Sequence, residues 1–283
     1  MTSSSFSANN ARSFSISSCW EVVDALESNI LSIFVNVIIY KIILLYRNML
    51  SHLSLLHSLV LSWLERIGAR TLAVPSELAL MEATVKGEQA EMRSWAWEQD
   101  FFHYIRLSYF RSKQRVEMLN LTLYPRIEYE IPMFATDFVI VGDRLRIGLI
   151  DAMPLLDTAE YQAHWVTPFA PLYAKSKALA VQYERKLDWS FRYLSPHACM
   201  ATQLELNQLP ALFELWEAYF SLYWQLLNNT PQHTSADFQS LVQHWQQDYN
   251  TSHLAVEHDR NPLMHYFGTE LGKRYHEEFL FRL

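Results

Sequence analysis

Asp137 is the residue of this sequence whose surroundings point most directly to chemistry. It interrupts the apolar segment 133–141, in which Met, Phe, Val and Ile predominate. A carboxylate inside an apolar strand costs free energy unless it is paired, hydrogen-bonded or protonated. A buried carboxyl with a raised pKa is what general acid catalysis near neutral pH requires. Strand alternation alone leaves two interpretations open, a pocket acid or a carboxylate that faces solvent.

Two other clusters contain residue types that bind metals or act as nucleophiles. Glu257, His258 and Asp259 are consecutive, but their spacing matches neither the zinc motif H-E-x-x-H nor a facial triad. We therefore predict no metal site at this cluster. Cys199 follows His197 by two residues, and residues so close in sequence rarely face each other as nucleophile and base. Core packing is the better interpretation for Cys199.

The glycine-rich loops that commonly bind nucleotides are absent from the sequence. It contains no G-x-G-x-x-G, no Walker-type loop and no G-x-S-x-G elbow, and only six glycines in all. A net charge of −7 argues against nucleic-acid binding, because phosphates require concentrated Lys and Arg. Lys and Arg nevertheless outnumber Asp and Glu between residues 101 and 192. This balance is typical of a mixed surface and would also suit an acidic protein partner.

Five segments in the middle of the chain have the pattern of β-strands. They are rich in β-branched and aromatic residues and are separated by turn residues, and they cover residues 88–99, 101–111, 114–124, 135–141 and 145–153. Helical periodicity surrounds this block, at residues 50–67, 171–186, 206–227, 234–248 and 269–281, and the first helix is expected to stop at Gly68. This order predicts an α/β fold, an α/β/α sandwich with a central antiparallel sheet flanked by helices on both faces.

Residues 1–48 are expected to form an N-terminal extension of a domain that covers residues 49–283. The extension begins with a Ser-rich stretch that we expect to be flexible, and its apolar run, residues 30–46, is at the lower limit for spanning a bilayer. A membrane anchor is one interpretation of this run. We favour translation that starts at Met49, because the chain from there reads as a complete domain. The only two cysteines, Cys19 and Cys199, offer no disulfide framework, which favours a reducing compartment.

Several short motifs, in order along the chain, resemble those of the ferredoxin-dependent bilin reductases. The central one resembles an N/H-x-x-x-x-P strand end followed by F-x-x-D, and consists here of Asn120, Pro125, Pro132, Phe134 and Asp137. The next strand, LIDAMPL at residues 149–155, is similar to an L-D-x-x-P-L element of the family. Upstream, SWAW at residues 94–97 resembles a strand of the members that make 15,16-dihydrobiliverdin. The segments FG at 267–268 and EFLF at 278–281 are similar to the terminal signature of the family.

The resemblance implies reduction of an open-chain tetrapyrrole by single electrons from reduced ferredoxin, with no bound metal or flavin. The reaction implied first is biliverdin to 15,16-dihydrobiliverdin. Asp137 would be the central proton donor. Asn120 stands where phycocyanobilin-forming members have histidine, and because an amide is not a comparable acid, it would hydrogen-bond the bilin or a pocket water. Substrate-binding residues would be Phe134, Met153, Arg260, Arg144 and Arg146, with the arginines as candidate propionate ligands.

A second carboxylate is also implied, in a D-P-x-R loop before the terminal helix, and here the sequence departs from the family pattern. Counting back from Phe267 without gaps places Glu257 at this position and keeps Arg260 in register. A two-residue deletion places Asp259 there instead. Both remain candidates, and the choice between a two-electron and a four-electron product is thought to depend on this step.

Three alternatives accompany this interpretation. Within the same class, the enzyme would reduce 15,16-dihydrobiliverdin to phycoerythrobilin, or make phycoerythrobilin from biliverdin in four electrons. Outside the class, it would be a bilin-binding carrier or a scaffold tethered to the membrane through residues 30–46. The partners implied are ferredoxin and a bilin, with a heme oxygenase or a second bilin reductase for substrate transfer. The localisation implied is the cytoplasm, or the plastid stroma in a eukaryote.

Overall fold

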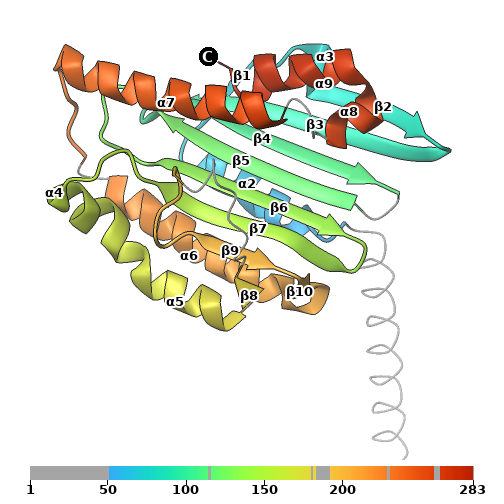
Figure 1. Ribbon diagram of the computed structural model, residues 1–283, viewed down its shortest axis with the longest axis horizontal. Coiled ribbons are helices and arrows are strands. Elements are labelled where there is room, and N and C mark those ends of the chain that lie inside the picture. Colours follow the sequence, from blue (N-terminus) through green and yellow to red (C-terminus); the bar gives the residue numbers. More distant parts are fainter. Residues whose placement is uncertain are drawn as a thin grey trace, which may run out of the picture. The chain divides into compact units, whose positions relative to one another are not determined.

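One antiparallel sheet forms the centre of the fold (Figure 1). The computed structural model describes residues 51–113, 116–179, 181–182, 192–227, 230–257 and 262–282. Within these ranges the sheet has ten strands, in the order β1-β3-β4-β5-β6-β7-β9-β8, with β2 beside β3 and β10 beside β7. Each strand pairs antiparallel with its neighbours.

The five long strands that the sequence predicts are present and form a meander. Their bounds are β3 Glu88–Gln99, β4 Phe102–Ser112, β5 Val116–Pro125, β6 Met133–Val141 and β7 Arg144–Met153. The hairpin between β6 and β7 turns at Gly142, whose positive φ of 69° favours glycine. Five short strands, which the sequence analysis did not predict, extend the sheet. They are β1 Arg70–Leu72, β2 Leu80–Val85, β8 Val181–Gln182, β9 Cys199–Thr202 and β10 Leu204–Glu205.

Helices cover both faces of the sheet, which confirms the predicted α/β/α sandwich (Figure 1). One face packs against α2 (Ser54–Arg66), α5 (Ala170–Leu179) and α6 (Leu209–Leu227). The other face packs against α7 (Ala236–Glu257), α8 (Pro262–Phe267) and α9 (Thr269–Tyr275). The remaining helical segments are short, and they are α3 Ser76–Ala79, α4 Ala159–Tyr161, the π-helical turns Gln162–Val166 and His276–Leu280, and the 3₁₀ turns Thr167–Phe169 and Leu206–Gln208.

Helix α2 shows how the sequence attaches a helix to the sheet. Its buried residues Leu56, Val60 and Leu64 recur every four positions, so they form one apolar stripe. At its start, the carboxylate of Glu117 on β5 accepts hydrogen bonds from the backbone N–H groups of His52 and Leu53 at 3.0 and 2.9 Å. At its end, the chain leaves the helix at Gly68, as the sequence predicted.

The predicted helix bounds need correction at the C-terminal end, and the predicted N-terminal extension lies outside the described residues. Helix α7 continues nine residues beyond the predicted end at residue 248, to Glu257, and α8 was not predicted at all. The extension 1–48 and its apolar run 30–46 lie outside the described residues, so the domain boundary stays a prediction. In the part of the chain that the structure describes, no helix is long and apolar enough to cross a membrane.

Candidate active site

Four polar side chains form a row across the sheet, on the face that α7–α9 cover. Ser94, Ser108, Asn120 and Asp137 come from β3, β4, β5 and β6, and each is the direct cross-strand partner of the next. Directly opposed residues of antiparallel strands project to the same face, with Cβ atoms about 4.5 to 5.5 Å apart. The strand register therefore assembles a polar row from positions that are far apart in the sequence.

Hydroxyl groups saturate the β3–β4 end of the polar row. The Tyr275 hydroxyl of α9 lies 2.6 Å from Ser108 Oγ and accepts a hydrogen bond from Ser94 Oγ at 3.1 Å. All three residues are buried. This end of the row is thus closed by the terminal helix, and the amide and carboxyl at the other end remain to interact with a ligand.

Asp137 has the surroundings expected of a general acid. It retains some exposed surface, but its carboxyl is enclosed by protein atoms, and this burial raises its pKa. A hydrogen-bonding contact with Asn120 and the positive charge of Arg106 act in the opposite direction on the same pKa. The neighbouring apolar side chains on this face are only partly buried, and they are Met118, Val139, Leu149 and Met200. An apolar ligand placed against them would contact a protonatable carboxyl.

Arg106 lies in the next row of the same face and is missing from the residues predicted. It is 2% exposed and pairs across the strands with Ala96 and Thr122. Its Nη1 donates a hydrogen bond to Asn120 Oδ1, and its guanidinium lies 5.7 Å from the centre of the Phe281 ring. A charged residue inside the aromatic strand FHYIRLSYF was the signal that could have revealed it.

His253 of α7 faces the same region and is neutral at physiological pH. Burial, with the nearby charges of Arg106 and Arg192, lowers the pKa of His253 to about 4 despite its hydrogen bond to the backbone oxygen of Tyr249. The Nδ1 atom lies 2.8 Å from that oxygen, so a neutral imidazole donates there. His253 therefore adds no positive charge to that of the buried Arg106 guanidinium.

Asp151 is a second carboxyl on this face, and it is hydrogen-bonded to Ser195. It is fully buried on β7, two residues from the cross-strand partner of Asp137. Its oxygens accept hydrogen bonds from the backbone N–H of Ser195 at 2.8 Å and from the Ser195 hydroxyl at 2.5 Å. Burial raises the pKa of Asp151 to about 7. Because both oxygens have partners, Asp151 anchors the segment around Ser195.

Phe134 and Met153, predicted as ligand contacts, occupy opposite faces of the sheet. Phe134 is three residues from Asp137 on the same strand, so its side chain points the other way and packs 5.2 Å from the Phe220 ring of α6. We assign Phe134 to the core and correct the expectation on that ground. Met153 lies on the same face as Asp137, in the second core cluster, and is 3% exposed.

The predicted propionate ligands Arg144 and Arg146 lie at the start of β7. Both donate hydrogen bonds to the turn between β9 and β10, Arg144 to the backbone oxygen of Gln203 at 3.1 Å and Arg146 to its side chain at 2.6 Å. Arg144 also forms a 3.5 Å ion pair with Glu205. The structure thus ties these arginines to the β9–β10 turn, and their propionate role stays a prediction.

The two candidates for the second carboxylate were Glu257 and Asp259. Glu257 is the last residue of α7, which runs toward the C-terminal helices, and Asp259 and Arg260 lie outside the described residues. Among the residues that the structure does describe, no group of three or more His, Cys, Asp and Glu side chains could hold a metal ion. Cys199 is fully buried, and burial raises the pKa of its thiol to about 12.

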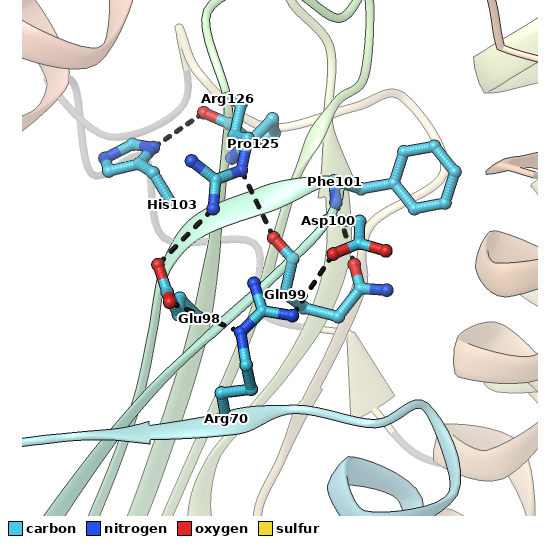
Figure 2. A network of polar contacts seen from close by, with 8 residues as sticks. All are labelled: Arg70, Glu98, Gln99, Asp100, Phe101, His103, Pro125 and Arg126. Carbon is cyan, nitrogen blue, oxygen red and sulfur yellow. Dashed lines mark hydrogen bonds and ion pairs between the residues drawn. The ribbon is translucent and has the colours of Figure 1, made fainter.

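A separate polar network at the β3–β4 hairpin has a structural role (Figure 2). Arg70 bridges Glu98 and Asp100 at 3.4 and 3.3 Å, and Arg126 bridges Glu98 at 3.4 Å. Gln99 closes the turn by accepting the backbone N–H of Phe101 at 2.8 Å. Arg70 is exposed and Arg126 and Glu98 are only partly buried, so these ion pairs add little to stability. They link the β3–β4 turn to β1 and to the residue that follows β5.

Comparison with known proteins gives this geometry a context. The family model "Ferredoxin-dependent bilin reductase" matches residues 56–282. The 15,16-dihydrobiliverdin:ferredoxin oxidoreductase of Nostoc punctiforme is 27% identical over 222 residues, which are 77% of this chain and 89% of that protein. The phycoerythrobilin:ferredoxin oxidoreductase of Gloeobacter violaceus is 26% identical over 221 residues, 74% of this chain and 86% of that protein.

A solved structure has the same fold. Phytochromobilin synthase from tomato, crystallised in complex with biliverdin, superposes with a TM-score of 0.68 at 18% identity and covers 82% of this chain and 83% of that one. At this identity the likeness concerns the fold alone. The family model covers most of the chain and includes every strand of the sheet. The chain therefore belongs to the ferredoxin-dependent bilin reductase family and is an oxidoreductase.

Proposed function

We propose that this chain reduces biliverdin to 15,16-dihydrobiliverdin, with electrons from reduced ferredoxin and Asp137 as the proton donor. The observation that carries the proposal is a buried carboxyl of raised pKa at the end of a polar row, beside partly exposed apolar side chains. Support for the substrate comes from the names of the relatives and from the biliverdin complex of the structural neighbour.

The reaction takes up two electrons and two protons, so each biliverdin consumes two one-electron donors. The bilin itself accepts the electrons, with no bound flavin or metal in this proposal. The task of the chain is then to hold a planar apolar molecule and to supply protons. Because burial raises its pKa, Asp137 is protonated more readily than an exposed aspartate, and it can transfer this proton to a carbon of the bilin. Glu257 and Asp259 are the candidates for the second proton transfer.

Asn120 supports this proton transfer without being an acid itself. Its amide contacts the Asp137 carboxyl and lowers the pKa that burial raises, which means that it stabilises the carboxylate left after the proton has gone. Because an amide cannot serve as a second acid at this position, Asn120 argues against the vinyl-group reduction of the phycocyanobilin-forming members and favours the phycoerythrobilin branch. A bilin lactam or a pocket water would compete for the remaining hydrogen bonds of Asn120.

Product identification tests the proposed reaction. The full chain is incubated anaerobically with biliverdin and reduced ferredoxin, and the bilins are separated by chromatography. The expected product is 15,16-dihydrobiliverdin, without further conversion. Phycoerythrobilin formed from biliverdin would indicate a four-electron enzyme, whereas turnover of 15,16-dihydrobiliverdin alone would indicate the later step. A bilin spectrum that changes on mixing but not after reduction of ferredoxin would indicate a carrier.

The variant Asp137→Asn tests the proton donor. We expect it to bind biliverdin with unchanged affinity and to lose turnover by roughly 10²-fold or more, because the amide cannot donate a comparable proton. Asp143→Asn, the same change at the exposed β6–β7 hairpin, is the matched control and should keep turnover. Normal product formation by Asp137→Asn would remove Asp137 from the mechanism.

A further inference from the structure

Arg106 is a buried cation on the face of the sheet that carries the polar row. Among the described residues, no carboxylate lies within ion-pair distance of its guanidinium, and its Nε has no hydrogen-bond partner. Burying a charge is costly unless hydrogen bonds or an opposite charge compensate. Its Nη1 donates a hydrogen bond to Asn120 Oδ1, and the guanidinium also interacts with the hydroxyl of Tyr124. The hydrogen bond to Asn120 therefore connects this buried charge to the polar row.

The chemistry of the two groups fixes the orientation of the Asn120 amide. The oxygen and nitrogen of an amide are normally hard to distinguish by position alone. A guanidinium, however, has five donors and no acceptor, so the amide atom that faces it must be the oxygen. The NH2 group of Asn120 then points to the other side, where its direct cross-strand partner is Asp137.

We propose that Arg106 is a positioning residue, which holds the amide of Asn120 with its NH2 group toward Asp137. This inference rests on the proposed function, in which Asp137 gives up a proton. A fixed N–H donor favours the carboxylate over the neutral acid, so Arg106 and Asn120 together make Asp137 a stronger acid than burial alone would allow. The donor is oriented before the proton leaves, and no reorientation is needed during transfer.

Among the described residues, other titratable groups also face this side of the sheet. They are Tyr104 on β4, Tyr124 on β5, Asp151 on β7, Arg192 and Tyr193 before β9, Tyr249 and His253 on α7, Tyr266 on α8, Tyr275 on α9, and His276 and Arg282 after it. The pKa of Asp137 itself is shifted by three causes: burial raises it, whereas the hydrogen bond with Asn120 and the charge of Arg106 lower it. Asp151 has a carboxyl resonance of its own, so its titration is followed separately from that of Asp137.

Carbon-13 NMR of the aspartate carboxyl groups tests the inference without any bilin. The resonance that disappears in Asp137→Asn identifies Asp137, and its pH titration is followed in the full chain. Arg106→Met should raise the pKa of Asp137 by about one pH unit or more. In the Asn120→Ala background the same substitution should raise it clearly less, since only the direct charge effect remains. Equal shifts in both backgrounds would overturn the positioning role.

Two further variants keep the test decisive. If Arg106→Met fails to fold, Arg106→Lys retains the charge but lacks the planar fork, and should raise the pKa by a smaller amount that again depends on Asn120. An Arg106→Lys shift that persists unchanged in Asn120→Ala would contradict the proposal. Arg192→Met, which removes an exposed guanidinium bound to Tyr193 and Asp248, is the matched control and should leave Asp137 unshifted.

Turnover gives an independent measurement. A donor that must be protonated loses activity as the pH rises through its pKa, so Arg106→Met should move the basic limb of the pH profile upward by the NMR shift and lower the maximum. A merely structural role would lower the maximum and leave the limb in place. If the chain reduces no bilin at all, the proposed function fails, while the NMR titration still decides the Arg106–Asn120 coupling.

Discussion

The opposite face of the sheet, behind the polar row, carries a row of its own. It consists of Leu107, Leu121, Thr136 and Ile150 on β4 to β7, and each is the cross-strand partner of the next. The only polar group in that set, the Thr136 hydroxyl, accepts a hydrogen bond from Trp216 Nε1 at 3.0 Å. The α7–α9 face instead keeps an amide and a carboxyl that still have hydrogen-bonding capacity. One layer of backbone thus separates a face built for stability from a face that retains polar groups for chemistry, and the two should respond differently to substitution.

The largest difference is expected at Phe134, on the apolar face. Phe134→Ala should lower the free energy of unfolding by about 3 to 5 kcal/mol, because it leaves a cavity against Phe220 and Tyr223. Bilin affinity of the folded variant should stay the same. Val139→Ala, on the other face of the same strand and only partly buried, should cost about 1 kcal/mol in chemical denaturation. Weaker bilin binding by folded Phe134→Ala would return this residue to the site.

A pH-dependent difference is expected at Asp151, on the polar face. Its pKa of about 7 in the folded protein exceeds the unfolded value, so the folded state holds the proton more tightly and loses stability as the pH rises from about 4 to 7. Asp151→Asn should reduce this loss by roughly 2 to 4 kcal/mol, measured as the free energy of unfolding against pH. Exposed Asp143→Asn should keep the wild-type slope. An unaltered slope in Asp151→Asn would show that this carboxyl does not titrate in that range.

The smallest difference is expected at Thr136. Thr136→Val removes the acceptor of a buried indole N–H and should cost about 1 to 2 kcal/mol of unfolding free energy. Thr136→Ser keeps the hydroxyl and should recover most of that amount. If valine were tolerated as well as serine, the Trp216 hydrogen bond would contribute nothing to the apolar face, and packing alone would explain it.

The sequence predicted the frame of this fold well because its signals are local. Alternation and turn residues place β3 to β7 within a few residues, and Gly68 ends the first helix as expected. Short edge strands such as β9 and β10 escaped prediction, because they owe their conformation to pairing with β7 rather than to their own residues.

The site was predictable only in part. The cost of a carboxyl in an apolar strand made Asp137 a candidate, and the same reasoning applied to Arg106 and Asp151 would have made them candidates too. What no local pattern contains is the register that sets Asn120 opposite Asp137 and Ser108 opposite Asn120. Phe134 was predicted as a ligand contact because it belongs to the same motif as Asp137. Strand alternation, however, turns its side chain to the opposite face of the sheet.

The polar row also restricts how this chain can change in evolution. Antiparallel pairing allows a hairpin tip to grow or shrink, because the paired residues on either side keep their partners. One residue inserted within β4 or β5, between the tip and the row, would turn Ser108 or Asn120 toward the opposite helices and separate Asp137 from its amide. Insertions and deletions in relatives should therefore collect at the hairpin tips, while the strand segments between Ser94 and Asp137 keep their length even where their side chains diverge.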